Sequence, residues 1–386
     1  MLIWQVIFWL CVLMVLHTYV LYPWILSRVK EKADSRPISS ELPKLDILIA
    51  AYNEEEVIQE KLNSILQADY PIEKIRILVG SDGSTDTTES IVKEMADKHP
   101  QLHLFSFERG GKSKVVNELM SRAEAELIIL TDANVLFSKD LIKEILSPFS
   151  DLEIGLVGAD IRARRVSSEV GIEFQENEYL QRETRMKWAE GEKWGTMMGA
   201  FGGCYAMRKS LFKVIPKEFL VDDFYLTMKV ISQGKKAVLA KDAICFEDIS
   251  SKMSEEFRRK VRMSRGNFQN LRQFSSFLVH SRPGLSFSFI SHKVLRWLTP
   301  LALILSFISS FILSKDYSMF EFLFWVQFLI LFTPLILKTI EAIGIRSRTI
   351  TFIAYFISMN TALFVGMIKS FRKVDKAIWE PTMRNQ

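Results

Sequence analysis

The chain has 386 residues, which is enough for more than one folded unit. Hydrophobic residues make up 48% of it and the mean hydropathy is +0.12, which argues against an entirely soluble protein. The net charge of +5 is too small to indicate a nucleic acid as the partner.

The hydrophobic excess begins at the amino terminus. Residues 2–26 contain no Asp, Glu, Lys or Arg, and a helix needs about 20 apolar residues to cross a bilayer. The segment is too long for a cleavable signal and lacks its basic start and small-residue exit. We therefore predict a membrane anchor over residues 1–27 and a juxtamembrane linker over 28–43, with a buried core helix as the alternative.

The C-terminal third repeats this pattern, so we predict an interfacial segment over residues 271–289, a transmembrane region over 290–371 and a cytoplasmic tail over 372–386. With the amino terminus outside, four full spans would also leave the basic tail outside, against the preference of Lys and Arg for the cytoplasm. The last apolar segment contains Asn360, and we expect it to be re-entrant or interfacial. Whether the chain has three or four membrane spans stays open. The apolar segments are 297–313, 320–337 and 350–368.

Lys and Arg beside these spans predict a multi-pass protein of the inner cell membrane with its middle region in the cytoplasm. The basic stretch 258–272 fits anionic lipid headgroups better than nucleic acid, above all at Arg258, Arg265 and Arg272. The three cysteines follow no disulfide or zinc spacing, which suits a reducing compartment. They are Cys11, Cys204 and Cys245.

The middle region, residues 44–270, alternates apolar runs with helical patterns. Strands that are apolar on both faces and alternate with amphipathic helices predict a parallel sheet covered on both sides. Right-handed crossovers would make it a doubly wound, Rossmann-like α/β fold. The expected strands are 45–52, 75–80, 102–107 and 127–132.

Polar residues follow each expected strand, where sheets of this kind bind ligands. Helix caps and turn residues are the alternative explanation for each of them taken singly. No GxGxxG follows the first strand, so the usual dinucleotide fingerprint is absent. The residues are Asn53 and Glu54 after the first strand, Asp82 after the second, Lys112 after the third, and Asp132 with Asn134 after the fourth.

Asp132 and Asn134 are two residues apart on an extended segment, so their side chains point the same way. Carboxylate and amide oxygens are ligands for Mg²⁺ or Mn²⁺, and Mg²⁺ completes its shell with phosphate oxygens and water. We therefore predict that this pair holds Mg²⁺ or Mn²⁺ against a diphosphate. An Asx turn at the strand exit is the alternative.

Five motifs, in this order, resemble the family 2 glycosyltransferases, which are inverting enzymes of GT-A fold that use nucleotide sugars. The resemblance covers about residues 44–270, and the flanking apolar helices are similar to the membrane-bound branch that contains polysaccharide synthases. It implies that Asn53, Glu54 and Asp82 hold the nucleoside, that Lys112 lies near the nucleotide, and that Asp132 and Asn134 fill the DxD metal position. The motifs are AAYNEEEVI, GSDGSTDTT, GGKSKVVN, TDAN and VDDFYLTMK.

The second metal position is Asn134 where the family usually has Asp. One negative charge is therefore lost, and we expect the cation and the diphosphate to bind cooperatively.

The acid pair Asp222 and Asp223 stands in an apolar context, where like charge and burial raise one pKa toward a useful value. The resemblance places the catalytic base at the acid followed by x-x-Leu, which is Asp223, with Asp222 as its neighbour. Capping of the helix that follows is the alternative role.

Two further segments are assigned through the resemblance. The glycine-rich stretch implies acceptor binding by Gly199, Phe201, Gly202 and Gly203, with a plain flexible turn as the alternative.

Arg262 and Met263 stand where polysaccharide synthases have the Arg-Trp of Gln-x-x-Arg-Trp. Arg262 can hold a diphosphate, but Met263 offers no flat aromatic face to a sugar, which disfavours processive polymer synthesis.

The predicted function is transfer of a sugar from a nucleoside diphosphate donor, for which we expect a UDP-sugar, to a lipid-linked or polysaccharide acceptor at the membrane. Other biosynthetic membrane proteins are conceivable partners. A processive polysaccharide synthase and a nucleotide-binding membrane protein without catalysis are the alternatives.

Overall fold

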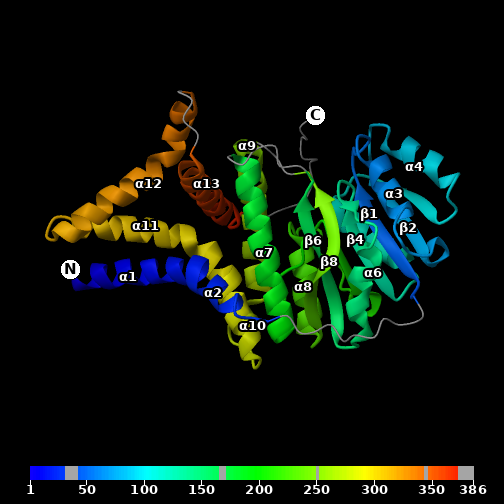
Figure 1. Cartoon of the computed structure of the whole chain (residues 1–386), viewed down its shortest axis with the longest axis horizontal. Coiled ribbons are helices and arrows are strands. Elements are labelled where there is room, and N and C mark those ends of the chain that lie inside the picture. The colour runs from blue at the N-terminus through cyan, green and yellow to red at the C-terminus, as the bar shows by residue number, and fades with distance from the viewer. Residues whose placement is uncertain (31–41, 165–170, 249–251, 343–346, 373–386) are drawn as a thin grey trace.

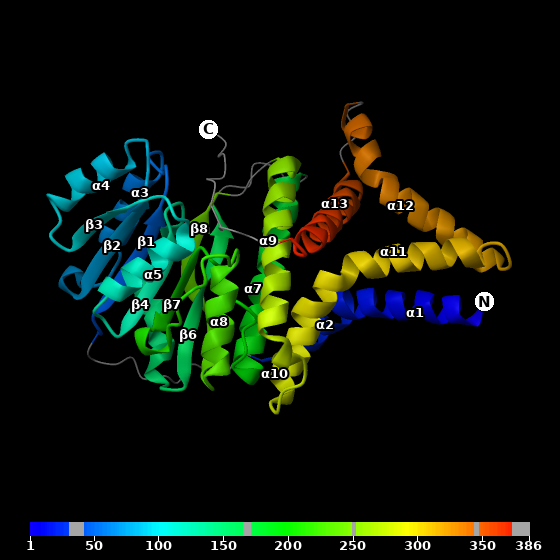
Figure 2. The same ribbon diagram turned by 180° about the vertical axis from the view of Figure 1, so that it is seen from behind.

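The computed structural model describes residues 1–30, 42–164, 171–248, 252–342 and 347–372, and the side chains of these residues except 338–342. An α/β domain forms one end of the molecule and apolar helices project from the other (Figure 1). Two long helices, α7 (Ile172–Trp194) and α9 (Met253–Gln273), stand between these parts (Figure 2).

The domain is built on a mixed sheet with the strand order β3-β2-β1-β4-β7-β6-β8-β5. Its first four strands are parallel neighbours, and β6 and β8 are parallel as well, so the predicted Rossmann-like, mostly parallel fold is confirmed. The sequence did not indicate the antiparallel strand β7, which is inserted between β4 and β6. The strands are β1 (Leu45–Ala51), β2 (Ile75–Asp82), β3 (Leu102–Phe107), β4 (Leu127–Asp132), β5 (Leu136–Phe137), β6 (Ile154–Ala163), β7 (Cys204–Arg208) and β8 (Lys236–Glu247).

Helices cover both faces of the sheet because its central strands are apolar on both sides. In β1, Leu48 and Ala50 pack on one face with α5 and α8, whereas Ile47 and Ile49 pack on the other with α3, α4 and α6. Because β1 to β4 are parallel, their carboxyl ends meet at one edge of the sheet. The helices are α3 (Ile58–Leu66), α4 (Thr88–Ala96), α5 (Lys112–Arg122), α6 (Leu141–Leu146) and α8 (Asp222–Ser232).

Among the described residues, four helices are long and apolar enough to cross a membrane. The first, residues 2–26, joins α1 (Leu2–Leu16) to α2 (Tyr22–Leu26) through a π-helical turn. The second begins at Pro283, within the segment expected to be interfacial, and joins α10 (Pro283–Ser288) to α11 (Leu295–Leu313) through another π-helical turn. The others are α12 (Ser318–Ala342) and α13 (Arg348–Lys369).

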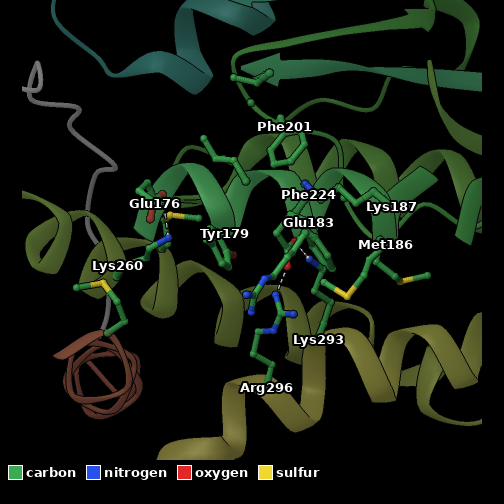
Figure 3. A pocket seen from close by; sticks show the side chains of 18 of the residues that line it. Glu176, Tyr179, Glu183, Met186, Lys187, Phe201, Phe224, Lys260, Lys293 and Arg296 are labelled. Carbon is green, nitrogen blue, oxygen red and sulfur yellow. Dashed lines mark hydrogen bonds and ion pairs between the residues drawn. The ribbon is translucent and has the colours of Figure 1, made fainter. Parts of the chain in front are cut away.

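The last of these helices, α13, differs from the rest in direction. It is one unbroken helix, which excludes a re-entrant loop, and it runs across the direction of α11 (Figures 1 and 3). Both of its ends touch the long helices of the domain. Arg348 lies 4.9 Å from the ring centre of Phe174 on α7, and the Ser370 carbonyl accepts a 3.2 Å hydrogen bond from Arg272 on α9. This placement is the one that an interfacial helix would have.

Candidate active site

A cavity of about 1340 Å³ lies between the carboxyl edge of the sheet, α7, α9 and the apolar helices. It collects most of the residues that the sequence singles out, although they come from five separate parts of the chain. They are Lys112, Asp132, Asn134, Gly199, Phe201, Gly202, Gly203, Asp222, Asp223 and Arg262.

Asn53, Glu54 and Asp82 lie at the same edge of the sheet but not in the cavity wall. The Asp82 carboxylate accepts the backbone N–H of Gly110 at 2.7 Å and pairs with Arg109 at 2.6 Å. The Asn53 side chain accepts the N–H of Thr85 at 2.8 Å, and the N–H of Glu54 binds the Thr88 hydroxyl at 2.8 Å. In this structure the Asn53 and Asp82 side chains, like the Glu54 backbone, hold the loops after β1 and β2. Nucleoside binding by these three residues stays a prediction.

The turn that carries Asp132 and Asn134 is held by contacts from two sides. The N–H of Asp132 donates to the carbonyl of Gly203 at 3.0 Å. The buried Lys61 ammonium donates to the hydroxyl of Thr131 at 2.8 Å and to the carbonyl of Val135 at 2.5 Å, and burial lowers its pKa to about 8. Within the described residues, no backbone N–H binds a side-chain oxygen of Asp132 or Asn134, so the Asx-turn alternative is wrong.

Lys112 opens α5 and links the two predicted acid sites. Its ammonium lies 2.6 Å from a carboxylate oxygen of Asp132 and 3.9 Å from one of Asp222. Burial alone would lower the pKa of Lys112, but the neighbouring carboxylates of Asp132 and Asp222 outweigh it and raise the pKa. One cation therefore lies between the predicted metal position and the acid pair.

A third oxygen donor joins the metal position. The Asn134 amide lies 3.4 Å from a carboxylate oxygen of Glu247, and burial and the charge of Asp132 raise the pKa of that carboxyl. The sequence analysis missed Glu247, although it ends the apolar run of β8 as Asp132 ends that of β4.

This donor set fits Mg²⁺ or Mn²⁺, because all three residues offer hard oxygen atoms. In the part of the chain that the structure describes, no group of three or more His, Cys, Asp or Glu side chains is arranged to hold a metal on its own. A cation would therefore need oxygen atoms from a ligand as well.

The acid pair lies in the first turn of α8. The residue that caps this helix is Val221, and no side chain makes the cap bond, so the capping alternative for Asp222 and Asp223 is wrong. Asp223 is partly buried, and burial together with the charge of Asp222 raises its pKa to about 6, against the opposing effect of Lys112. That value suits a group that must accept a proton near neutral pH.

The glycine-rich segment packs directly against this acid. A Cβ atom at Gly202 would lie 2.9 Å from a carboxylate oxygen of Asp223, and one at Gly199, whose φ is +86°, would lie 2.6 Å from the ring of Phe224. Both positions therefore require glycine for close approach to α8. A merely flexible turn does not explain this packing.

Arg262 projects from α9 into the cavity and, within the described residues, makes no hydrogen bond or ion pair. Other basic residues of α9 are engaged, for example Arg259 and Lys260 with Glu176. Arg265 and Arg272 donate to carbonyls at the end of α13, and their expected contact with lipid headgroups stays a prediction. Arg258 is exposed, and its contact with headgroups stays a prediction.

Helix α7 is the part of the site that the sequence analysis missed. Glu176, Glu183 and Glu190 are spaced by seven residues and lie on one face, and all three are buried. Glu183 pairs with Lys293 at 3.3 Å and with Arg296 (Figure 3). Each glutamate binds side chains from different helices. The partners are Arg259, Lys260 and Tyr355 for Glu176, His292, Lys293 and Arg296 for Glu183, and Tyr22 and His292 for Glu190.

Comparison with known proteins agrees with this geometry. Residues 46–215 match the family described as "Glycosyl transferase family 2". These residues form a family 2 glycosyltransferase domain. The domain contains β1 to β4 and the DxN turn, whereas the acid pair, Arg262 and the apolar helices lie outside the matched range.

Relatives and solved structures extend the likeness to the rest of the chain. The probable glycosyltransferase YdaM of Bacillus subtilis is 26% identical over 59% of this chain, and the chain spans 56% of its length. The poly-β-1,6-N-acetyl-D-glucosamine synthase of Staphylococcus epidermidis is 23% identical over 83% of this chain and 80% of its own. The structure of the mannosyltransferase PcManGT from Pyrobaculum calidifontis, in complex with GDP-Man and Mn²⁺, superposes with a TM-score of 0.71 at 21% identity. It covers 95% of this chain and 99% of that one. The fold of the glycosyltransferase domain is therefore GT-A, and its apolar helices have counterparts.

Proposed function

We propose that this glycosyltransferase is an inverting, metal-dependent enzyme that moves a sugar from a UDP-sugar to an acceptor at the inner membrane. The observation that carries the proposal is the position of Lys112, which spans the 2.6 Å to Asp132 and the 3.9 Å to Asp222. The predicted metal position and the acid pair that contains the predicted base, Asp223, thus meet at one ammonium group. Donor and acceptor can meet in the cavity between them.

The chemistry follows from these positions. The acceptor hydroxyl attacks the anomeric carbon from the face opposite the diphosphate, a new C–O bond forms, and the bond to the diphosphate breaks with its electron pair on the leaving oxygen. Asp223 accepts the hydroxyl proton. Lys112 and Arg262 offer positive charge to the leaving diphosphate. A divalent cation held by Asp132, Asn134 and Glu247 would neutralise further charge on that group.

The location of the cavity supports an acceptor that stays at the membrane. The end of the cavity away from the sheet is lined by aromatic side chains of the apolar helices. They are Tyr19, Trp24, Phe352 and Phe356. A lipid-linked or polysaccharide acceptor could enter there, and other biosynthetic membrane proteins could supply it. The catalytic domain would then face the cytoplasm, where nucleotide sugars are available to it.

A processive synthase is the second candidate, and the relative from Staphylococcus epidermidis gives it support. Met263, which lines the cavity beside Arg262, favours single additions because it offers no aromatic face to a sugar. The length of the product separates the two candidates, since a ladder of polymer excludes single transfer.

The donor is identified by thermal-shift screening of the purified chain against nucleotide sugars, with and without Mn²⁺. We expect stabilisation by a UDP-sugar that depends on Mn²⁺. Stabilisation by GDP-mannose alone, the ligand of the solved mannosyltransferase, would contradict the choice of UDP.

The role of Asp223 is tested by Asp223→Asn, which keeps the shape of the side chain and removes the base. Turnover should fall by about 100- to 10,000-fold while donor binding persists. Asp242→Asn, at an exposed position of β8, is the matched control and should leave both unchanged. Unchanged turnover in Asp223→Asn would contradict the assignment, and loss of donor binding would mean that the substitution disturbs the whole site.

A further inference from the structure

The proposed reaction leaves one buried cation of the cavity without a role. Lys187 lies on α7, its side chain lines the cavity, and only 5% of its surface is exposed. Its ammonium lies 3.4 Å from the ring centre of Phe201, and within the described residues it makes no hydrogen bond or ion pair. Figure 3 shows it near Phe201 and Phe224.

This position is unfavourable for a lysine without a counter-ion. Burial and the neighbouring charge of Lys293 lower the pKa of Lys187 to about 7. The glutamates on either side of it along α7 are already occupied, Glu183 by Lys293 and Arg296, and Glu190 by Tyr22 and His292. A cation–π contact compensates for only part of the lost hydration. The cavity therefore holds a cation that an anionic ligand would stabilise.

Phe201 and the glycines beside it place this cation on the acceptor side. Phe201 belongs to the segment whose Gly202 packs against Asp223, so an anion on Lys187 would lie close to the proposed base. Arg262, a second cavity cation that makes no hydrogen bond or ion pair within the described residues, lies on α9 and is already assigned to the donor diphosphate. The two cations come from different helices, and this suits two separate anionic groups.

We propose that Lys187 binds a phosphate group of the acceptor, which is a sugar linked through that phosphate to a lipid, so that the attacking hydroxyl belongs to the sugar and the lipid chain lies against the apolar helices. The inference rests on the proposed function, because it names the acceptor class of the same site. The chain of the lipid would lie along Tyr19, Trp24, Phe352 and Phe356, which line the far end of the cavity. Lys293, held by Glu183 at 3.3 Å, adds positive charge near the phosphate.

The test uses the full chain in dodecyl maltoside micelles and calorimetric titration with three probes: dodecyl phosphate, dodecanol and inorganic phosphate. Wild type should bind dodecyl phosphate at least about 10-fold more tightly than either of the others, because only this probe offers both the anion and the chain. Lys187→Met should weaken that binding by about 10- to 100-fold, the range of a charge-assisted hydrogen bond. Lys187→Arg should retain most of it.

Lys193→Met is the matched control, since Lys193 lies on the same helix, stacks on Trp194 at 4.8 Å and is outside the cavity wall. It should bind dodecyl phosphate as wild type does. Titration with the donor nucleotide and Mn²⁺ reports separately on folding and on the proposed function. If the donor binds to Lys187→Met as tightly as to wild type, the loss of dodecyl phosphate binding in this variant is specific to the acceptor side.

Equal binding of dodecanol and dodecyl phosphate, or unchanged binding in Lys187→Met, would overturn the inference while leaving the proposed function intact. Inorganic phosphate binding as tightly as dodecyl phosphate would also overturn it, because the site would then recognise a free anion. Failure of wild type to bind any nucleotide sugar would overturn the proposed function instead.

Discussion

At the scale of single residues, the proposed base predicts the pH dependence of the reaction. In that role Asp223 must be ionised to accept a proton, and its pKa is raised to about 6 by burial and by Asp222. The rate should therefore fall as the pH drops through about 6. Asp222→Asn removes the like charge, lowers the pKa of Asp223 and should move this acidic limb down by about one pH unit.

The measurement is kcat/KM of wild type and Asp222→Asn between pH 4.5 and 8, with Asp242→Asn as the control. An acidic limb that stays at the same pH in Asp222→Asn would show that another group titrates in this range.

Asn134 should lower the negative charge of the proposed metal position. With one carboxylate fewer than a DxD motif, wild type should bind Mn²⁺ weakly alone and tightly with the nucleotide. Asn134→Asp should strengthen binding of Mn²⁺ alone by about 10-fold or more, because ligand charge tunes cation affinity. The new carboxylate would also lie near Glu247, now 3.4 Å from the amide, and a cation would relieve their repulsion. Calorimetry with and without UDP measures this, and tight Mn²⁺ binding by nucleotide-free wild type would contradict it.

At the scale of elements, α7 is the support on which the apolar helices are fixed. Glu183 is buried against Lys293 and Arg296, so Glu183→Gln would leave two buried cations poorly balanced. Loss of one partner of a buried pair costs about 3–5 kcal/mol. We therefore expect a clearly lower unfolding temperature for Glu183→Gln in detergent.

Glu178→Gln is the control for this prediction. Glu178 pairs at 4.0 Å with Arg182 on the same helix, and 40% and 62% of their side-chain surfaces are exposed. Such exposed pairs contribute about 0–1 kcal/mol. Equal unfolding temperatures for the two variants would show that the Glu183 cluster does not stabilise the fold.

These elements also show how much of the fold and of the site could be predicted from the sequence. The strands β1 to β4 and the residues at their ends were predictable, because buried parallel strands are continuous apolar runs that end at one edge. The antiparallel β7 was not, since its place depends on pairing with distant strands. α7 was missed because its glutamates are polar in sequence and buried only by cations from other helices. Lys187 was missed for a similar reason. Among the described residues it has no carboxylate partner because Glu183 and Glu190 bind side chains of other helices, and the sequence does not show this.

At the scale of the whole molecule, α13 decides on which side of the membrane the chain ends. Arg348 at its start lies over Phe174 of α7, and the Ser370 carbonyl at its end binds Arg272 of α9. Although α13 is long and apolar enough to span a membrane, we infer from these two contacts that it lies along the membrane surface and does not cross it. Three crossings would then leave the amino terminus outside and the carboxyl end in the cytoplasm, in agreement with the basic residues there.

Epitope tags at the two termini test this arrangement by protease accessibility in sealed inside-out and right-side-out vesicles. The C-terminal tag should be cleaved only in inside-out vesicles and the N-terminal tag only in right-side-out ones. Both tags cleaved on the same side would show that α13 spans the membrane.

The central claim is that the cation, the donor diphosphate and the proton acceptor meet in one cavity. The most direct measurement is a crystal structure of the chain with Mn²⁺ and a non-transferable UDP-sugar analogue, with anomalous data collected at the manganese edge. We predict an anomalous peak in contact with Asp132 and the diphosphate, with the anomeric carbon facing Asp223 across the cavity. A peak away from Asp132, or a sugar that Asp223 cannot reach, would contradict the account.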